Sequence, residues 1–160
     1  MVSSLAYTHT DKDEQSVRFF KEIKNNLGLH SSRKLVSVVR AVLSQLRKTL
    51  SHEQSSVVIN TLPSLFQLLF VANWKYDDKQ EPIMHLDELV DNIYQEDKKQ
   101  KKSLFKSEID TLNSVLLIIS KLDKFFGILG LNVFRYSLTQ ELKQAVVEET
   151  SLGSTAVINN

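Results

Sequence analysis

Turn-forming residues are scarce in this chain. It has 4 Gly and 2 Pro among 160 residues, about 4%, whereas an ordinary protein carries roughly 12% of the two together. A β-sandwich or β-barrel needs a turn about every 8–12 residues, so this composition argues against all-β folds. Hydrophobic residues make up 42%, which is typical of a globular domain rather than a disordered chain. The length suits a single domain.

Cysteine is absent, which excludes disulfides and thiolate chemistry. The N-terminal residues, MVSSLAYTHTDKDE, contain neither a basic stretch nor an apolar run, so no signal peptide is predicted. The longest apolar stretch, 114–131, is interrupted by Lys121, Asp123 and Lys124, which argues against a membrane helix. We expect a cytoplasmic protein that makes no use of a membrane.

Apolar periodicity and capping patterns predict helices along most of the chain. Gly28 is expected to end the first helix, Ser51 followed by Gln54 forms a capping-box pattern, and Ser107 can cap a later helix. The predicted helices are 11–27, 31 or 32 to 50, 51 to the residues before Pro63, 63–74, 83–95, 107–122, a short or broken helix within 125–134, and 139–149.

The expected core faces follow from the same spacing. The first helix is predicted to bury Val17, Phe20, Ile23 and Leu27. The helix after Ser107 is predicted to turn four apolar side chains inward, namely Ile109, Leu112, Leu116 and Ile119. The segment 63–74 is apolar on nearly every side and is predicted to be the most buried helix.

We therefore predict an all-α protein, a compact helical bundle of seven to eight helices forming one domain over 11–149. Residues 1–10 and 150–160 are expected to be disordered. The apolar positions of the first helix match those of 83–93 at a constant offset of 66 residues. Two alternatives remain open: a duplication into two four-helix repeats, about 11–76 and 77–149, or a chance match between apolar helices.

Three pieces of the sequence together resemble a known family. They are an amphipathic opening segment that ends in Leu27-Gly28-Leu29, the run RAVLSQLR at 40–47, and LP at 62–63 leading to Trp74. This pattern resembles the uncharacterised bacterial family named domain of unknown function 2267, over roughly residues 14–147. The resemblance implies an all-helical fold and brings no activity with it. Where that family usually has Arg-Gly before an aromatic residue, this chain has Gln67-Leu68 before Phe70.

Sequence motifs for catalysis are missing. None of the four histidines stands three or four residues from another, so no helical metal pair is predicted. Gly127 and Gly130 lack the remaining residues of a phosphate-binding loop, and no serine lies in a nucleophile-elbow context. We predict no catalytic, metal-binding or cofactor-binding residues, and we expect a protein that is not an enzyme.

Opposite charges gather in two segments. Residues 31–50 carry five basic residues and no acid, with Arg33, Arg40 and Arg47 spaced by seven, whereas 77–97 carry eight acids and one lysine. One interpretation is that the two segments pair within the fold, so that Arg40 and Arg47 pair with acids of the region 77–97, where Asp87 and Asp91 lie one turn apart on a common face. The other is that the basic stripe binds an acidic partner or a nucleic-acid backbone.

Further candidates lie beyond the basic stripe. The lysine-rich run 98–106 is expected to be an exposed connection, and the two aromatic residues after the apolar helix plug the core or anchor a partner. The candidate interaction residues are Arg33, Arg40, Arg47, Trp74, Tyr76, Lys98, Lys99, Lys101 and Lys102.

The function itself is not readable from the sequence. We favour a non-enzymatic protein-interaction module that binds another protein, as a monomer or weak homodimer. The alternative is a nucleic-acid-associated protein that uses the basic stripe. A small-molecule sensor is a third class, because helix bundles can hold ligands between helices.

Overall fold

The computed structural model describes residues 2–75, 79–80 and 83–159, and within them it contains seven α-helices and no strand. The chain is 77% helical, so the predicted all-α bundle is confirmed. The elements are α1 (Val2–Leu27), α2 (Ser32–Lys48), α3 (His52–Thr61), α4 (Ser64–Val71), α5 (Leu86–Gln100), α6 (Glu108–Phe126), the 3₁₀ turn η1 (Ile128–Leu131) and α7 (Tyr136–Asn159).

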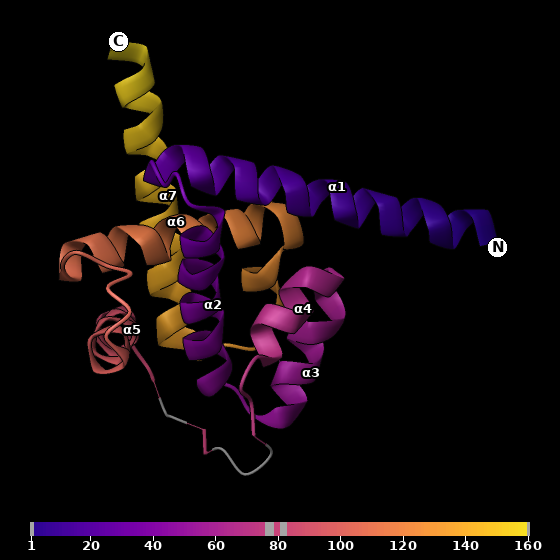
Figure 1. Ribbon diagram of the computed structural model, residues 1–160, viewed down its shortest axis with the longest axis horizontal. Helices are drawn as coiled ribbons and strands as arrows, with labels where there is room; N and C mark the ends of the chain where they lie inside the picture. Colours follow the sequence, from indigo (N-terminus) through magenta and orange to yellow (C-terminus); the bar gives the residue numbers. More distant parts are fainter. Residues whose placement is uncertain (1, 76–78, 81–82, 160) are drawn as a thin grey trace.

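Helix α2 is the centre of the bundle. It packs against α1, α4, α5 and α6, and its eight buried residues exceed those of any other helix whose burial is given in full. Figure 1 shows α1 and α6 lying across one end of α2, with α3 and α4 on one side of it and α5 on the other. Helix α7 packs against α6 and α5 and extends past α1 in this view.

Local capping chemistry sets where the helices begin and end. The Ser31 hydroxyl accepts the backbone N–H of Lys34, and Ser51 and Gln54 form both hydrogen bonds of a capping box. Ser107 caps α6 by accepting the N–H of Asp110. Gly28 adopts the left-handed conformation directly after α1, which glycine allows without steric cost. The predicted signals at Gly28, Ser51 and Ser107 are confirmed, and of the two residues left open for the start of the second helix, Ser31 is the N-cap.

A cluster of phenylalanine rings joins helices that are distant in sequence. The ring of Phe66 in α4 lies 4.8 Å from that of Phe19 in α1 and 5.1 Å from that of Phe126 in α6. The Phe20 ring stacks on Phe66 at 5.3 Å. Offset and edge-to-face contacts of this kind stabilise a core beyond simple burial, so the cluster fixes how α4 meets the α1–α6 pair.

The ends of the chain differ from expectation. Helices were predicted over 11–27 and 139–149, but α1 begins at Val2 and α7 ends at Asn159. No glycine or proline interrupts 2–27, and once a helix has nucleated each added residue gains a hydrogen bond. Helix α7 also begins at Tyr136, three residues before the predicted start at Thr139, whose buried hydroxyl donates to the carbonyl of Phe134.

Three predictions about burial are wrong. Helix α4 is short and is not the most buried helix, because Leu65 and Leu68 face outward. In α1 the predicted Ile23 is buried, but Phe19 is buried beside it and the predicted Val17 is exposed. Ile109 at the start of α6 was expected to face inward and is 72% exposed. Hydrophobic periodicity gives the width of an apolar face but not which part of it a neighbouring helix covers.

The boundaries around the lysine run also differ. Helix α5 was predicted over 83–95, but it begins at Leu86 and continues to Gln100, so Lys98 and Lys99 lie in its last turn. Lys101 follows as a left-handed C-cap. Helix α6 likewise runs four residues past its predicted end, to Phe126. Cations in a last turn interact favourably with the negative end of the helix dipole, which accounts for the extension of α5.

We predict that Leu69→Ala lowers the free energy of unfolding by about 2–5 kcal/mol, the usual cost of truncating a core leucine. Leu69 is 5% exposed, and the neighbouring Leu68 is 67% exposed. Leu68→Ala is therefore the matched control and should cost less than about 0.5 kcal/mol. Urea denaturation of both variants measures the difference, and equal losses would mean that the burial of α4 is misassigned.

Candidate functional site

The three arginines of the basic stripe lie in three different environments. Arg33 is exposed in the first turn of α2, Arg40 is half-buried in the wall of a small cavity, and Arg47 is 4% exposed. Because these side chains do not share a surface, the stripe predicted from their spacing does not form one continuous basic face.

Arg47 joins α2 to the end of α4. Its Nη1 atom donates to the carbonyl oxygens of Phe70 at 2.8 Å and of Ala72 at 3.0 Å. The last carbonyls of a helix lack partners within it and carry the negative end of its dipole, so a guanidinium is well suited to this place. Its carbon lies 5.7 Å from the centre of the Trp74 ring, within cation–π range.

The predicted partners of Arg40 and Arg47 require correction. The hydrogen bonds described for Arg47 run to backbone carbonyls, and Asp87 and Asp91 line a separate groove. Arg40 lies in the wall of a cavity that Glu96 and Asp97 of the 77–97 segment also line. The sequence showed that the charges balance but not where each helix crosses its neighbour.

We expect Arg47→Met to lower the free energy of unfolding by about 1.5–3 kcal/mol, since it removes charge-assisted hydrogen bonds from buried carbonyls. Methionine retains much of the side-chain volume, so packing loss is small. The control is Arg33→Met, which changes the same charge at an exposed position and should stay within about 0.5 kcal/mol of the native protein. Chemical denaturation distinguishes the two, and a neutral Arg47→Met would contradict the structural role.

The other predicted interaction residues are also scattered. Trp74 is half-buried and stacks on His52 with ring centres 5.3 Å apart, so it belongs to the α2–α3 corner. Tyr76 lies outside the described residues. Lys98, Lys99, Lys101 and Lys102 are exposed at the end of α5, with Lys98 above the ring of Tyr94. Lys102 lines the same cavity as Arg40.

The largest concave surface described is instead an acidic groove of about 870 Å³, formed by the first turns of α5 and α6 together with α7. We call it the acidic groove. Its lining residues are His85, Leu86, Asp87, Glu88, Val90, Asp91, Glu108, Ile109, Leu112 and Glu141. Five of these ten carry carboxylates, and neither lysine nor arginine is among them.

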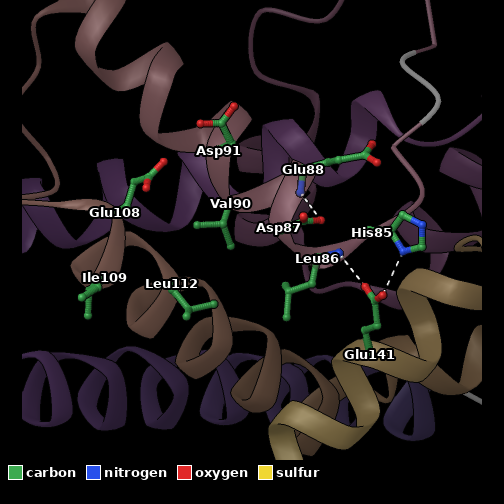
Figure 2. A pocket seen from close by; sticks show the side chains of 10 residues that line it. All are labelled: His85, Leu86, Asp87, Glu88, Val90, Asp91, Glu108, Ile109, Leu112 and Glu141. Carbon is green, nitrogen blue, oxygen red and sulfur yellow. Dashed lines mark hydrogen bonds and ion pairs between the residues drawn. The ribbon is translucent and has the colours of Figure 1, made fainter.

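An apolar strip runs through the acidic groove. Figure 2 shows Leu86, Val90 and Leu112 in the middle of the view, with Asp91 and Glu108 on one side and Glu141 on the other. Ile109 continues this strip and is the most exposed of its members. A large aliphatic side chain held in water among carboxylates is a feature of contact surfaces rather than of a core.

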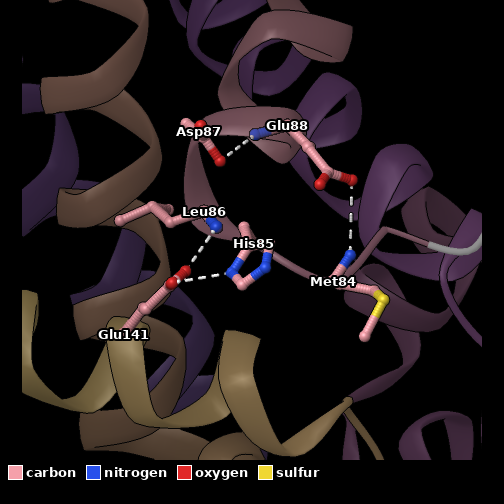
Figure 3. Close-up of polar contacts among 6 residues, drawn as sticks. All are labelled: Met84, His85, Leu86, Asp87, Glu88 and Glu141. Atoms are coloured by element: carbon pink, nitrogen blue, oxygen red, sulfur yellow. Dashed lines mark hydrogen bonds and ion pairs between the residues drawn. The ribbon is translucent and has the colours of Figure 1, made fainter.

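Glu141 fixes one end of the acidic groove. Its Oε2 atom accepts the backbone N–H of Leu86 at 2.7 Å, and its Oε1 atom lies 2.9 Å from Nδ1 of His85 (Figure 3). His85 stands at the N-cap of α5 but provides no side-chain cap. A carboxylate from α7 therefore satisfies an N-terminal donor of α5, which holds the two helices together.

This contact changes the ionisation of both partners. The hydrogen bond and charge of Glu141 raise the pKa of His85 above its ordinary value of 6.5. The N–H of Leu86 and then His85 lower the pKa of Glu141 below its ordinary 4.5. Stabilisation by His85 is present below about pH 6.5 and is lost as the pH rises through its raised pKa. Stabilisation by Glu141 is present above about pH 4.5 and is lost as the pH falls through its lowered pKa.

We predict that an NMR titration places the pKa of His85 above 6.5 and that Glu141→Gln moves it back toward that value. The variant retains a side-chain oxygen for the N–H of Leu86, so the helix cap can persist while the charge is removed. An unchanged His85 titration in Glu141→Gln would contradict the contact.

The sequence contained part of the signal for the acidic groove. The excess of acids in 77–97 was visible, and four groove residues with acidic or imidazole side chains fall within it: His85, Asp87, Glu88 and Asp91. Glu108, Ile109 and Glu141 could not be joined to them, because α6 and α7 reach this place only through tertiary packing. Ile109 was assigned to the core face of its helix, although Glu108 and Asp110 flank it, and these two acids were the available hint.

In the part of the chain that the structure describes, no group of three or more His, Asp or Glu side chains is arranged to hold a metal ion. None of the helices in that part of the chain combines the length and apolar character needed to cross a membrane.

Comparison with known proteins identifies one family. A family described as "Uncharacterized conserved protein (DUF2267)" matches residues 17–116. This segment runs from α1 through the first half of α6 and includes all the lining residues of the acidic groove except Glu141. None of the curated proteins matches the chain.

Proposed function

The chain belongs to the DUF2267 family of uncharacterised conserved proteins, and on that premise we propose that it is a non-enzymatic interaction module whose acidic groove binds a basic, amphipathic segment of another protein. The single observation that supports this most is the exposed Ile109 within a groove lined by five carboxylates. We further propose that it works in the cytoplasm, as a monomer or weak homodimer.

Charge and shape both favour this class of partner. The lysine or arginine side chains at the flanks of such a segment would pair with Asp87, Asp91 and Glu108. Attraction between opposite charges raises the association rate and slows dissociation of the complex. Apolar side chains spaced three or four residues apart would lie along the strip of Leu86, Leu112 and Ile109. The groove is large enough for one helix face but has no deep enclosed chamber for a substrate.

The nucleic-acid alternative has less support. Arg47 is buried against α4, and Arg40 is half-buried in a cavity wall that it shares with Glu96 and Asp97. Arg33 and the lysines at the end of α5 are left as the exposed members of the predicted set. The acidic groove repels phosphate, so binding to a DNA backbone is not the function we propose.

The test uses a fluorescent 14-residue amphipathic peptide of leucine and lysine, and a matched peptide in which glutamate replaces every lysine. We expect fluorescence anisotropy to show that the native protein binds the lysine peptide and does not bind the glutamate peptide. The Asp87→Asn/Asp91→Asn variant should bind the lysine peptide about tenfold more weakly than the native protein does. The matched control is Glu14→Gln/Glu53→Gln, which removes two exposed charges from other helices and should bind as the native protein does.

A second pair of variants tests the apolar strip. Ile109→Ser should weaken the binding of the lysine peptide several-fold, because it removes an aliphatic contact of the interface. Val17→Ser removes an equally exposed aliphatic group from α1 and should have no effect. Equal binding of the two peptides, or equal effects of groove and control variants, would contradict the proposed site. Binding of duplex DNA that Asp87→Asn/Asp91→Asn does not affect would favour the alternative.

A further inference from the structure

A second site of different character lies between α2 and the C-terminal half of α5. It is a cavity of about 80 Å³ with a mostly polar lining, which we call the α2–α5 cavity. Ser37, Arg40 and Ser44 line it from α2, spaced so that they share one helix face. Glu96 and Gln100 line it from α5.

Two buried polar atoms at this cavity lack hydrogen-bond partners. They are Nε of Arg40, which is a donor, and Oε1 of Gln45, which is an acceptor on a side chain that is only 4% exposed. More than nine in ten buried polar groups in proteins are hydrogen-bonded, and an exception calls for a ligand, an ion or ordered water. One donor and one acceptor at a single cavity require a partner that both accepts and donates.

The charged groups narrow the chemistry. Arg40 and Lys102 provide positive charge at the cavity, and Glu96 and Asp97 provide negative charge. Asp97 is already committed, because its two oxygens accept the backbone N–H groups of Leu104 and Phe105. Glu96 is the acid left facing the cavity, where Gln100 donates to its Oε1 atom.

A ligand of one charge sign fits poorly. An anion would satisfy Arg40 and Lys102 but would leave the Gln45 oxygen without a donor and would lie beside Glu96. A cation would satisfy Glu96 and Gln45 but would leave the Arg40 N–H without an acceptor. A zwitterion meets both requirements, since its carboxylate accepts from Arg40 and its ammonium donates to Gln45 and Glu96.

Size restricts the ligand further. The volume of about 80 Å³ is several times the roughly 10–15 Å³ that admits one water, so the cavity has room only for a ligand of a few heavy atoms. Drug-sized ligands need about 300 Å³ or more. We propose that the α2–α5 cavity is a binding site for a small α-amino acid, whose carboxylate is held by Arg40 and whose ammonium group is held by Gln45 and Glu96.

This proposal is independent of the acidic groove. The two sites share α5 but use different residues of it, and the lysine peptide and an amino acid are separate probes. The experiment is an NMR titration of the full chain with glycine and L-alanine. We expect saturable amide shifts at Ser37, Ser44, Gln45 and Glu96, without comparable shifts around Ile109.

Variants and ligand analogues distinguish specific binding from general effects. Arg40→Met and Gln45→Leu should each weaken the binding of L-alanine about tenfold or more, since each removes a buried hydrogen-bond partner of the ligand. Arg33→Met, which removes an exposed charge from the same helix, should have no effect. Gln45→Leu also tests the proposal if Arg40→Met fails to fold, because it replaces an unsatisfied buried group by an apolar one.

Three further compounds are titrated in the same way. Acetate carries only the carboxylate, ethylammonium carries only the ammonium group, and propionamide is a neutral molecule that both donates and accepts. We expect each to bind at least about tenfold more weakly than L-alanine. The absence of saturable shifts with either amino acid would overturn the proposal and leave ordered water as the occupant. Binding of propionamide equal to that of L-alanine would overturn the assignment of a zwitterion.

Discussion

The bundle depends on the way α2 holds the helices around it, and Arg47 is the most specific of its contacts. An apolar face can pack against several partners in several registers. Two hydrogen bonds from one guanidinium to the carbonyls of Phe70 and Ala72 are compatible with only one register of α4 against α2. They place the end of α4 against α2, which brings Phe66 to Phe19 and Phe126. These contacts fix the position of α3 and α4 relative to α1 and α6.

Helix α5 packs against α2, α6 and α7, and both candidate sites use it. Its buried side, around Leu89 and Ile93, packs into the bundle, and its N-terminus is tied to α7 through Glu141. The carboxylates of its first turns remain in water beside Ile109, where an apolar strip between charges favours a basic partner. Its last turns enclose the polar cavity against α2. One helix thus presents a surface suited to a macromolecule and a cavity suited to a small polar ligand.

Local signals were readable from the sequence, and tertiary ones were not. The caps at Ser31, Ser51 and Ser107 were predicted because a hydroxyl and an N–H three residues on lie within one turn. The exposure of Ile109 and Leu68 was missed because it depends on which neighbour covers a helix face. The hydrogen bonds of Arg47 to the carbonyls of Phe70 and Ala72 were missed because backbone carbonyls over twenty residues away leave no trace in side-chain charge. The predicted internal repeat stays a prediction.

The most direct test of the account is where a basic partner makes contact. Titrating the ¹⁵N-labelled protein with the leucine–lysine peptide and following amide shifts reads the contact surface residue by residue. If the acidic groove binds the peptide, the amide shifts concentrate at 85–91, at 108–112 and around Glu141, the three segments that form the acidic groove. Shifts concentrated at Lys98–Lys102 or spread evenly over all acidic residues would contradict it.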